Sequence, residues 1–432
     1  MKWSLLQMKL FDILTSKSFC ALPWVSVSTE TNGDIKLCCI SDSFIKKENG
    51  ENFNLGKDSI GDILNSEHLK SIRKDMMEGK LISGCDTCYK NENFGGKNSN
   101  RKIYNAHYMS KKDAFLNKVK ASIQDYTIPE SVEYVDIRFG NLCNLACRSC
   151  TPTSSSQFNK EVIQIHSTTP AIQEFHTPVR TDFNDWCNTE MFHSNIDSQL
   201  DNITEYYMNG GEPTIIDNNL MILTKMIDQG ASKNIIIKFN SNMTNNKKEF
   251  YDLLPNFKNV VFMCSIDGYG SVQEYLRYPS KWTQIDENLQ TLLSMKMSNL
   301  YIRLTPVISN INLEFFPELI SYFENLSDQY NVNMPLMPTV LTNPSHMSLL
   351  SLPMDYKAYC LEKIETFIEE NPRQRGWFFD ESIKIIKNQC TEDNDFVPLL
   401  CNFFEYNDIL DTNRNQSLAN VNPRLDGFRN LV

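Results

Sequence analysis

The sequence lacks an apolar run long enough to cross a membrane. A transmembrane helix needs roughly 18 or more consecutive apolar residues, and the most apolar N-terminal stretch, residues 5–14, is interrupted by Lys9 and Asp12. The same stretch does not have the pattern of a secretory signal peptide. We therefore predict a cytoplasmic protein with no membrane span.

Clusters of basic residues are also missing. The 53 acidic residues outnumber the 42 lysines and arginines, so the formal net charge is -11. A surface of this charge repels a phosphate backbone, and we predict no nucleic-acid partner. The 41% hydrophobic and 22% charged composition is that of a folded globular protein. A length of 432 residues allows two or three domains, or one large α/β barrel with an appendage.

Cysteine, in contrast, is abundant, with thirteen residues. Thiols stay reduced in the cytoplasm and are then available as metal ligands, so this number argues against a disulfide framework. Eight of the thirteen lie in the first 150 residues: Cys20, Cys38, Cys39, Cys85, Cys88, Cys143, Cys147 and Cys150. This clustering predicts metal sites.

Beyond residue 130, short apolar runs alternate with helix-like segments. The strand-like runs are residues 132–139, 203–208, 235–239, 260–265, 300–308 and 333–340; the helical patterns are 220–228, 247–254, 282–295 and 313–326. Such alternation predicts parallel strands joined by crossover helices, and so a partial or full β/α barrel. Residues 152–202 are too many for one crossover and predict an insertion.

Three cysteines follow the first predicted strand in Cys143-Asn-Leu-Ala-Cys147-Arg-Ser-Cys150. In a β/α barrel this loop lies at the active-site end. Three thiolates leave one iron of a [4Fe-4S] cluster open for a substrate or cofactor. The alternative is a zinc knuckle, but structural zinc takes four closed ligands, and no nearby histidine supplies the fourth. The spacing favours iron and sulfur.

These residues resemble the radical S-adenosylmethionine (SAM) superfamily, whose motif is Cys-x3-Cys-x2-Cys in that loop. The resemblance implies that Cys143, Cys147 and Cys150 are the catalytic cluster ligands. It also implies SAM contacts at the tips of the next strands: Gly210, Gly211, Glu212 and Pro213, in which the Glu position meets the methionine amino group; Asn240 and Asn242; Ser265 and Asp267; Arg277, for the SAM carboxylate; and Val307, in the adenine pocket.

Three of these positions have alternatives or departures. Arg277 could instead be a solvent-exposed helix arginine, and Val307 could pack in the core. Family members usually have an aromatic residue just before the third cysteine, where this chain has Ser149 next to Arg148. That leaves the adenine-stacking contact open without affecting cluster ligation.

The N-terminal cysteines have the spacing Cys-x12-Gly-x4-Cys, followed by Cys-x2-Cys. Asn32-Gly33 predicts a hairpin turn that brings Cys20 and Cys38 together, and a helix-like stretch at 60–78 leads back to the last pair. The spacing resembles the twitch module, a shortened SPASM domain that holds an auxiliary [4Fe-4S] cluster. The resemblance implies the ligands Cys20, Cys38, Cys85 and Cys88. Cys39 is a spare thiol that could exchange with its neighbour, and structural zinc on the same four cysteines is the alternative.

A module that precedes the barrel resembles the N-terminal-twitch radical SAM family. We therefore expect an α/β fold with a twitch-like module at 1–100, a linker at 101–130, a partial (β/α)6 radical SAM core at 131–345 and a helical C-terminal extension at 346–432. The resemblance implies two [4Fe-4S] clusters, SAM, and an electron donor such as flavodoxin or ferredoxin.

The implied activity is that of an oxidoreductase. SAM is cleaved reductively to a 5'-deoxyadenosyl radical that abstracts hydrogen from the substrate, and the auxiliary cluster accepts an electron. Oxidation or cross-linking of a peptide or protein side chain follows. One alternative is dehydrogenation of a small sugar-like alcohol. Another, from a different class, is a non-catalytic scaffold protein stabilised by zinc.

Overall fold

A seven-stranded sheet forms the centre of the computed structural model, which describes residues 12–93, 99–175 and 185–431. The strands are β1 (Ser26–Thr29), β2 (Ile35–Lys36), β3 (Tyr134–Arg138), β4 (Glu205–Asn209), β5 (Ile236–Ser241), β6 (Asn259–Cys264) and β7 (Leu300–Leu304). Their order is β2-β1-β3-β4-β5-β6-β7, and every neighbouring pair is parallel except β1 with β2. The predicted parallel α/β sheet is confirmed.

Within the described residues the sheet is open on the side of the last two predicted strands. The predicted fifth strand is split into β7 and β8 (Val307–Ile308) on either side of Pro306, which has no N–H to donate to a ladder. The predicted sixth strand contributes one bridge, from Leu336 to Leu304, and β9 (Thr339–Val340), which pairs with β8. The result is an open, partial barrel.

Crossover helices cover one face of the sheet. They are α9 (Asp217–Asp228), α10 (Lys248–Tyr251), α12 (Trp282–Ser294) and α13 (Phe316–Tyr330). Helix α12 buries Ile285, Leu289 and Leu292, spaced by one and two helical turns, as an amphipathic helix requires. On β5, Ile237 and Phe239 are buried toward these helices, whereas Lys238 and Asn240 are half-buried on the opposite face. We call that opposite face the inner face.

The N-terminal cysteine module is continuous with the sheet. The predicted hairpin forms as β1 and β2, with Gly33 in its turn, and β1 also pairs in parallel with β3. The predicted helix at 60–78 is two helices, α2 (Ile60–Leu64) and α3 (Glu67–Met77). The break falls where Ser66 caps the second helix by accepting a hydrogen bond from the Leu69 N–H (3.3 Å).

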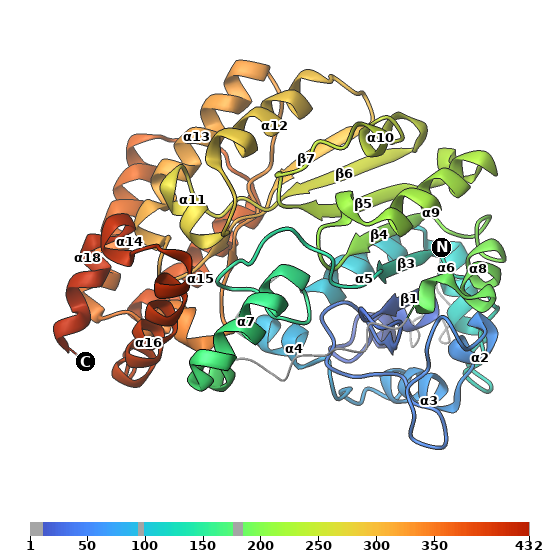
Figure 1. Cartoon of the computed structure of the whole chain (residues 1–432). Helices are drawn as coiled ribbons and strands as arrows, with labels where there is room; N and C mark the ends of the chain where they lie inside the picture. The colour runs from blue at the N-terminus through green and yellow to red at the C-terminus, as the bar shows by residue number, and fades with distance from the viewer. Residues whose placement is uncertain (1–11, 94–98, 176–184, 432) are drawn as a thin grey trace.

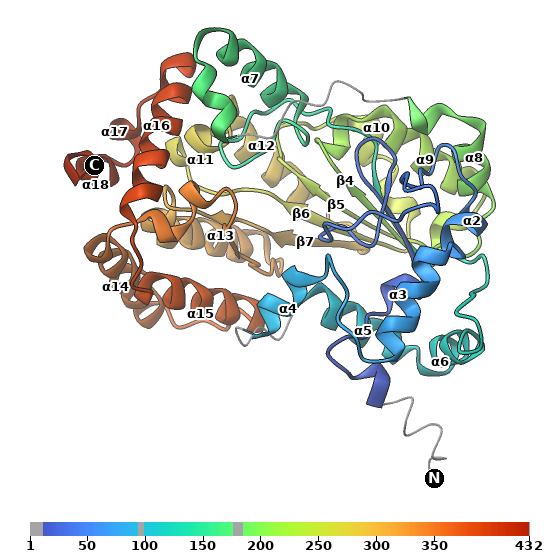
Figure 2. The same cartoon turned by 90° about the horizontal axis from the view of Figure 1, so that it is seen from below.

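Helices also form where we expected a linker. After α4 (Asp86–Asn93) come α5 (Asn100–Ser110) and α6 (Lys112–Ala121). Figures 1 and 2 show α5 on the side of the sheet opposite α10 and α12, and the Tyr104 ring lies 4.9 Å from the Tyr134 ring of β3. Helix α5 therefore covers part of the inner face. The domain boundaries stay predictions.

The remaining described segments are helical. The insertion contains α7 (Ser156–Thr168) and α8 (Glu190–Asp197), and α11 (Ser271–Leu276) follows β6. The C-terminal part contains α14 (Met354–Glu370), α15 (Trp377–Thr391), α16 (Val397–Arg414), α17 (Leu418–Val421) and α18 (Pro423–Asp426). None of the helices in the described ranges is long and apolar enough to span a membrane.

Trp186 of the insertion packs against the hairpin turn, and this contact yields a stability prediction. A Cβ on Gly33, whose φ is +84°, would lie 2.6 Å from Cδ2 of the Trp186 ring. Gly50 has a similar φ of +88° but no neighbour within 4 Å. We expect Gly50→Ala to lower the free energy of unfolding by about 1 kcal/mol through backbone strain alone. Gly33→Ala should cost roughly 1–3 kcal/mol more, through overpacking.

Urea unfolding of the two variants, purified anaerobically beside the wild type, measures both values. Equal losses for the two would contradict the packing of Trp186 on the turn.

Candidate functional site

The three-cysteine loop begins directly after β3, at the carboxyl ends of the parallel strands. It is held by its own neighbours: the Cys143 N–H donates to Ser156 Oγ (3.1 Å), and Ser155 Oγ donates to the Leu145 carbonyl (2.5 Å). The thiols of Cys143, Cys147 and Cys150 are close enough to influence one another's ionisation. Burial raises the pKa of Cys143 to about 12, and it raises the pKa of the other two as well.

The Gly-Gly-Glu-Pro segment packs directly on this loop. A Cβ on Gly211 would lie 2.1 Å from the Leu142 carbonyl oxygen, and its φ is +53°, so only glycine fits. The Glu212 N–H donates to the same carbonyl (2.8 Å). Gly210 is also at positive φ, and a Cβ on it would lie 2.9 Å from the Gly140 carbonyl oxygen. The two segments that the sequence marked separately therefore meet.

The Glu212 carboxylate has hydrogen-bond partners within the protein. Its side chain is buried and accepts hydrogen bonds from the Asn242 N–H (2.7 Å) and from Thr214 Oγ1 (2.7 Å). It caps the short 3-10 helix Pro213–Ile215. Burial raises its pKa, although these hydrogen bonds oppose the shift. In this structure the carboxylate links the tips of β4 and β5.

Asn242 also forms a tie within the protein. Its Nδ2 donates to Asn144 Oδ1 in the cysteine loop (2.9 Å), and its Oδ1 accepts from Thr244 Oγ1 (2.6 Å). Asn240, two residues earlier, faces the inner side and donates to the Tyr207 hydroxyl (3.3 Å). Ser265 is held by its backbone, which donates to the Ser241 carbonyl (2.8 Å). The tips of β5 and β6 are thus adjacent, as expected.

Arg277 lies at the cysteine loop and not in solvent. Its Nε and Nη2 donate to the two oxygens of Asp267 (2.7 and 3.0 Å), and its Nη1 is 4.0 Å from Cys147 Sγ. Asp267 Oδ1 also accepts from the Val307 N–H (2.8 Å). Three residues marked by the sequence therefore form one connected group, with a guanidinium nitrogen directed at the thiols.

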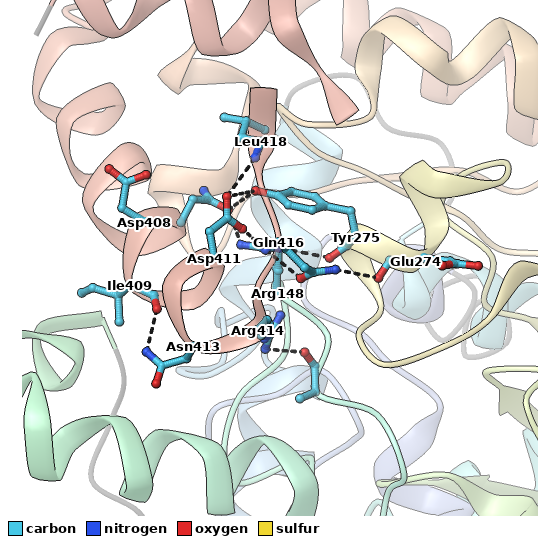
Figure 3. A network of polar contacts seen from close by, with 12 residues as sticks. Arg148, Glu274, Tyr275, Asp408, Ile409, Asp411, Asn413, Arg414, Gln416 and Leu418 are labelled. Carbon is cyan, nitrogen blue, oxygen red and sulfur yellow. Dashed lines mark hydrogen bonds and ion pairs between the residues drawn. The ribbon is translucent and has the colours of Figure 1, made fainter. Parts of the chain in front are cut away.

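Sequence reasoning missed the network that holds the loop from its other side (Figure 3). Arg148 is fully buried; its guanidinium donates to Asn407 Oδ1 (2.7 Å) and pairs with Asp411, both on α16. The guanidinium also stacks 3.7 Å from the centre of the Tyr275 ring. Arg414, at the end of α16, donates to the Ala146 carbonyl (2.7 Å). The unusual Arg148 was a visible signal, but its partners lie over 250 residues away.

The four N-terminal cysteines line a single cavity of about 410 Å³, a volume that includes its open mouth. The cavity contains the side chains of Cys20, Cys38, Cys85 and Cys88, together with Met76 and Arg101 among others. Burial raises the pKa of Cys38 to about 11 and that of Cys85 to about 12. Cys39 does not line this cavity: its sulfur accepts a hydrogen bond from Asn100 Nδ2 (3.4 Å).

The cysteines of both sets are available as metal ligands. All thirteen cysteines are free thiols. Within residues 12–93, 99–175 and 185–431, no group of three or more His, Cys, Asp or Glu side chains is gathered around one point as a single metal ion requires. Zinc places all its ligands about 2.0–2.3 Å from one ion, whereas a [4Fe-4S] cluster takes each thiolate on a separate iron.

Comparison with known proteins adds a family match for the N-terminal module. Residues 20–89 match the family model of SPASM, an iron–sulfur cluster-binding domain. In the search of curated proteins, nothing matched the chain.

Three solved structures have a low overall similarity. Native anSMEcpe with bound AdoMet and Cp18Cys peptide is 12% identical, with a TM-score of 0.35 over 56% of this chain and 60% of that one. SuiB of Streptococcus suis bound to S-adenosylmethionine is 11% identical, with a TM-score of 0.34 over 76% and 67%. SuiB bound to the precursor peptide SuiA is 11% identical, with a TM-score of 0.33 over 80% of this chain and 70% of that one. The chain spans about 60% of the length of anSMEcpe.

The SPASM match contains all four cysteines of the N-terminal cavity. The Cys-x3-Cys-x2-Cys loop, in turn, lies at the carboxyl edge of a parallel sheet, in contact with the Gly-Gly-Glu-Pro segment. Residues 20–89 therefore match an iron–sulfur cluster-binding domain, and the three-cysteine loop has the spacing expected from the sequence.

The Arg148 network predicts a large stability effect from one substitution on α16. Asp411→Ala removes the counter-charge of a fully buried guanidinium, and we expect a loss of about 3 kcal/mol in the free energy of unfolding. Asp408→Ala is the matched control on the same helix, because Asp408 pairs with Arg429 in a half-exposed ion pair. The control should cost less than about 1 kcal/mol.

Denaturant unfolding with far-UV circular dichroism checks both variants. A loss at Asp411 no larger than at Asp408 would show that α16 does not hold the cysteine loop.

Proposed function

We propose that this protein is a radical SAM oxidoreductase that oxidises or cross-links a side chain of a peptide or protein. One observation supports it above the others: the cysteine loop, the Gly-Gly-Glu-Pro segment and the Asp267–Arg277 pair meet at one edge of the sheet. The four-cysteine cavity adjoins the same sheet through the hairpin formed by β1 and β2.

Cys143, Cys147 and Cys150 would hold a [4Fe-4S] cluster with one open iron. When bound there and reduced, that cluster supplies an electron that cleaves SAM to methionine and a 5'-deoxyadenosyl radical, the species that takes hydrogen from substrate. Arg277 is the group suited to the SAM carboxylate, because Asp267 fixes its guanidinium and leaves Nη1 directed at the loop. The glycines at 210 and 211 allow close backbone approach.

The four cysteines of the N-terminal cavity would hold the second cluster. Four thiolates occupy every iron, so this cluster suits electron transfer better than substrate binding. A cluster held there would provide an acceptor for the electron that the substrate radical loses after hydrogen abstraction, so that the substrate would be oxidised by two electrons overall. The outside reductant for the first cluster would be a small electron-transfer protein such as flavodoxin or ferredoxin.

A peptide or protein substrate is an association and not a deduction from the site, since one fold serves many substrates. The branch with SPASM-type modules modifies peptides, and the anSMEcpe and SuiB structures contain bound peptides. A small sugar-like alcohol is the other substrate class.

Iron content and SAM cleavage test the assignment of the two cysteine sets. The anaerobically reconstituted wild type should hold about eight irons per chain. Replacing Cys143, Cys147 and Cys150 together by Ala should leave about four irons and abolish formation of 5'-deoxyadenosine with dithionite as reductant. Replacing Cys20, Cys38, Cys85 and Cys88 should also leave about four irons, but SAM cleavage should persist.

Cys39→Ala is the matched control, because this thiol lies outside the cavity lined by its neighbour. It should retain all the iron. Zinc in place of iron, with no 5'-deoxyadenosine, would instead support the scaffold alternative.

A further inference from the structure

Four polar side chains form a connected group on the inner face. They come from three adjacent strands, and we call them the inner-face cluster: Asp136 on β3, Tyr207 and Asn209 on β4, and Asn240 on β5. Asn209 Nδ2 donates to Asp136 Oδ1 (3.0 Å), and Asn240 Nδ2 donates to the Tyr207 hydroxyl (3.3 Å). A sheet face that only had to pack would carry apolar residues here.

Asp136 is the chemically distinctive member. Its side chain is 0% exposed, yet its Oδ2 accepts no hydrogen bond from any described residue. Asn240 Oδ1 is buried and likewise accepts none from the residues that the structure describes. A buried acceptor left without a donor costs about 1–3 kcal/mol, so two of them on one face lower the free energy of unfolding.

The cations of the inner face do not satisfy these acceptors. Arg138 pairs with Glu30 (3.1 Å) and donates to the Cys39 carbonyl (2.9 Å). Lys238, on β5, pairs with Glu205 (2.5 Å). Burial raises the pKa of Asp136, and both Arg138 and the hydrogen bond from Asn209 oppose that shift. The Cys39 thiol forms a side-chain hydrogen bond with Asp136. Asn240 Oδ1 has no donor among the described residues, and the Asp136 carboxylate can accept a further hydrogen bond beside those from Cys39 and Asn209.

The inner-face cluster lies between the two sets of cysteines. The Cys39 thiol is close enough to Asp136 to affect its ionisation, and Cys39 is the chain neighbour of Cys38 in the module cavity. At the other side, Asn209 directly precedes the Gly-Gly-Glu-Pro segment, and Asn240 directly precedes the tip of β5. A molecule on this face would be reachable from both cluster sites.

We propose that the inner-face cluster is the substrate site, and that Asp136 Oδ2 and Asn240 Oδ1 accept hydrogen bonds from an N–H donor group of the substrate, an amide or an ammonium. This inference rests on the proposed function, because it assumes a substrate held between the two clusters. A carboxylate group of a ligand would be excluded. Its oxygens only accept hydrogen bonds, so they would face Asp136 Oδ2 and Asn240 Oδ1 with no proton between them. A bound water could also satisfy the acceptors, but it would not discriminate between ligands.

A matched pair of peptides tests the donor requirement. The probes are fluorescein-labelled Gly-Gly-X-Gly-Gly peptides in which X is Gln, Glu or Lys; Gln and Glu have nearly the same shape and differ in N–H donors. Binding is followed by anaerobic fluorescence anisotropy with the reconstituted enzyme and SAM. We expect the Gln peptide to bind about tenfold more tightly than the Glu peptide. Tighter binding of the Lys peptide than of Gln identifies an ammonium as the donor; the reverse identifies an amide.

Asp136→Asn should reduce the Gln-to-Glu affinity ratio to about one or invert it, because the new amide donates where the carboxylate accepted. Asn240→Leu removes the second acceptor and should weaken binding of the Gln peptide several-fold. Asp252→Asn removes the same charge from an exposed pair with Lys248 and should leave the ratio unchanged. The iron content of each variant shows whether it is folded. If Asp136→Asn loses iron, its peptide binding is not interpreted, and the result for Asn240→Leu is used instead.

No binding of the Gln and Lys peptides, no Gln-over-Glu preference in the wild type, or an unchanged preference in the deciding variant overturns the inference. Formation of 5'-deoxyadenosine by the wild type is measured separately. If the wild type prefers the Gln peptide but forms no 5'-deoxyadenosine, only the proposed function is contradicted. If it forms 5'-deoxyadenosine without preferring the Gln peptide, only the proposed donor site is contradicted.

Discussion

The position of the three-cysteine loop depends on a buried guanidinium. Arg148 lies inside the loop, and its side chain extends away from the thiols into α16, where Asn407 and Asp411 neutralise and orient it. From the opposite side, Gly211 and Glu212 press against the Leu142 carbonyl. The loop is therefore held between the strand tips and a C-terminal helix, and its sulfurs cannot shift without breaking hydrogen bonds in a dry environment, where each is costly to lose.

This rigidity suits the chemistry of buried thiols. Burial raises the pKa of the cluster cysteines in both sets, so without metal they stay protonated at neutral pH. Thiolates are the form that binds iron, and so cluster insertion must release protons into the solvent. Arg277 adds a fixed positive charge 4.0 Å from Cys147 Sγ, which favours the thiolate form. The protein thus positions its ligands before the metal arrives.

The sheet links the two cysteine sets. Because β1 of the module pairs directly with β3 of the core, the geometry between the sets is set by a hydrogen-bonded ladder and not by a linker. Helix α5, in the segment that looked like a linker, covers part of the inner face and places Asn100 on the Cys39 thiol. The polar inner face, partly covered in this way, carries the two buried acceptors Asp136 Oδ2 and Asn240 Oδ1.

The sequence by itself determined the strands of the parallel sheet, the hairpin at Gly33 and the two groups of cysteines, because each depends on residues close together in the chain: the period of apolar residues, a turn residue, or a short metal-ligand spacing. Only the tertiary structure decided where Glu212 points, which thiol of the pair at 38 and 39 faces the cavity, and that Pro306 leaves the barrel open. It also decided that Arg148 finds Asp411 and that Asp136 keeps a free oxygen. Such facts depend on contacts between segments up to 263 residues apart, and neither periodicity nor spacing within one segment contains that information.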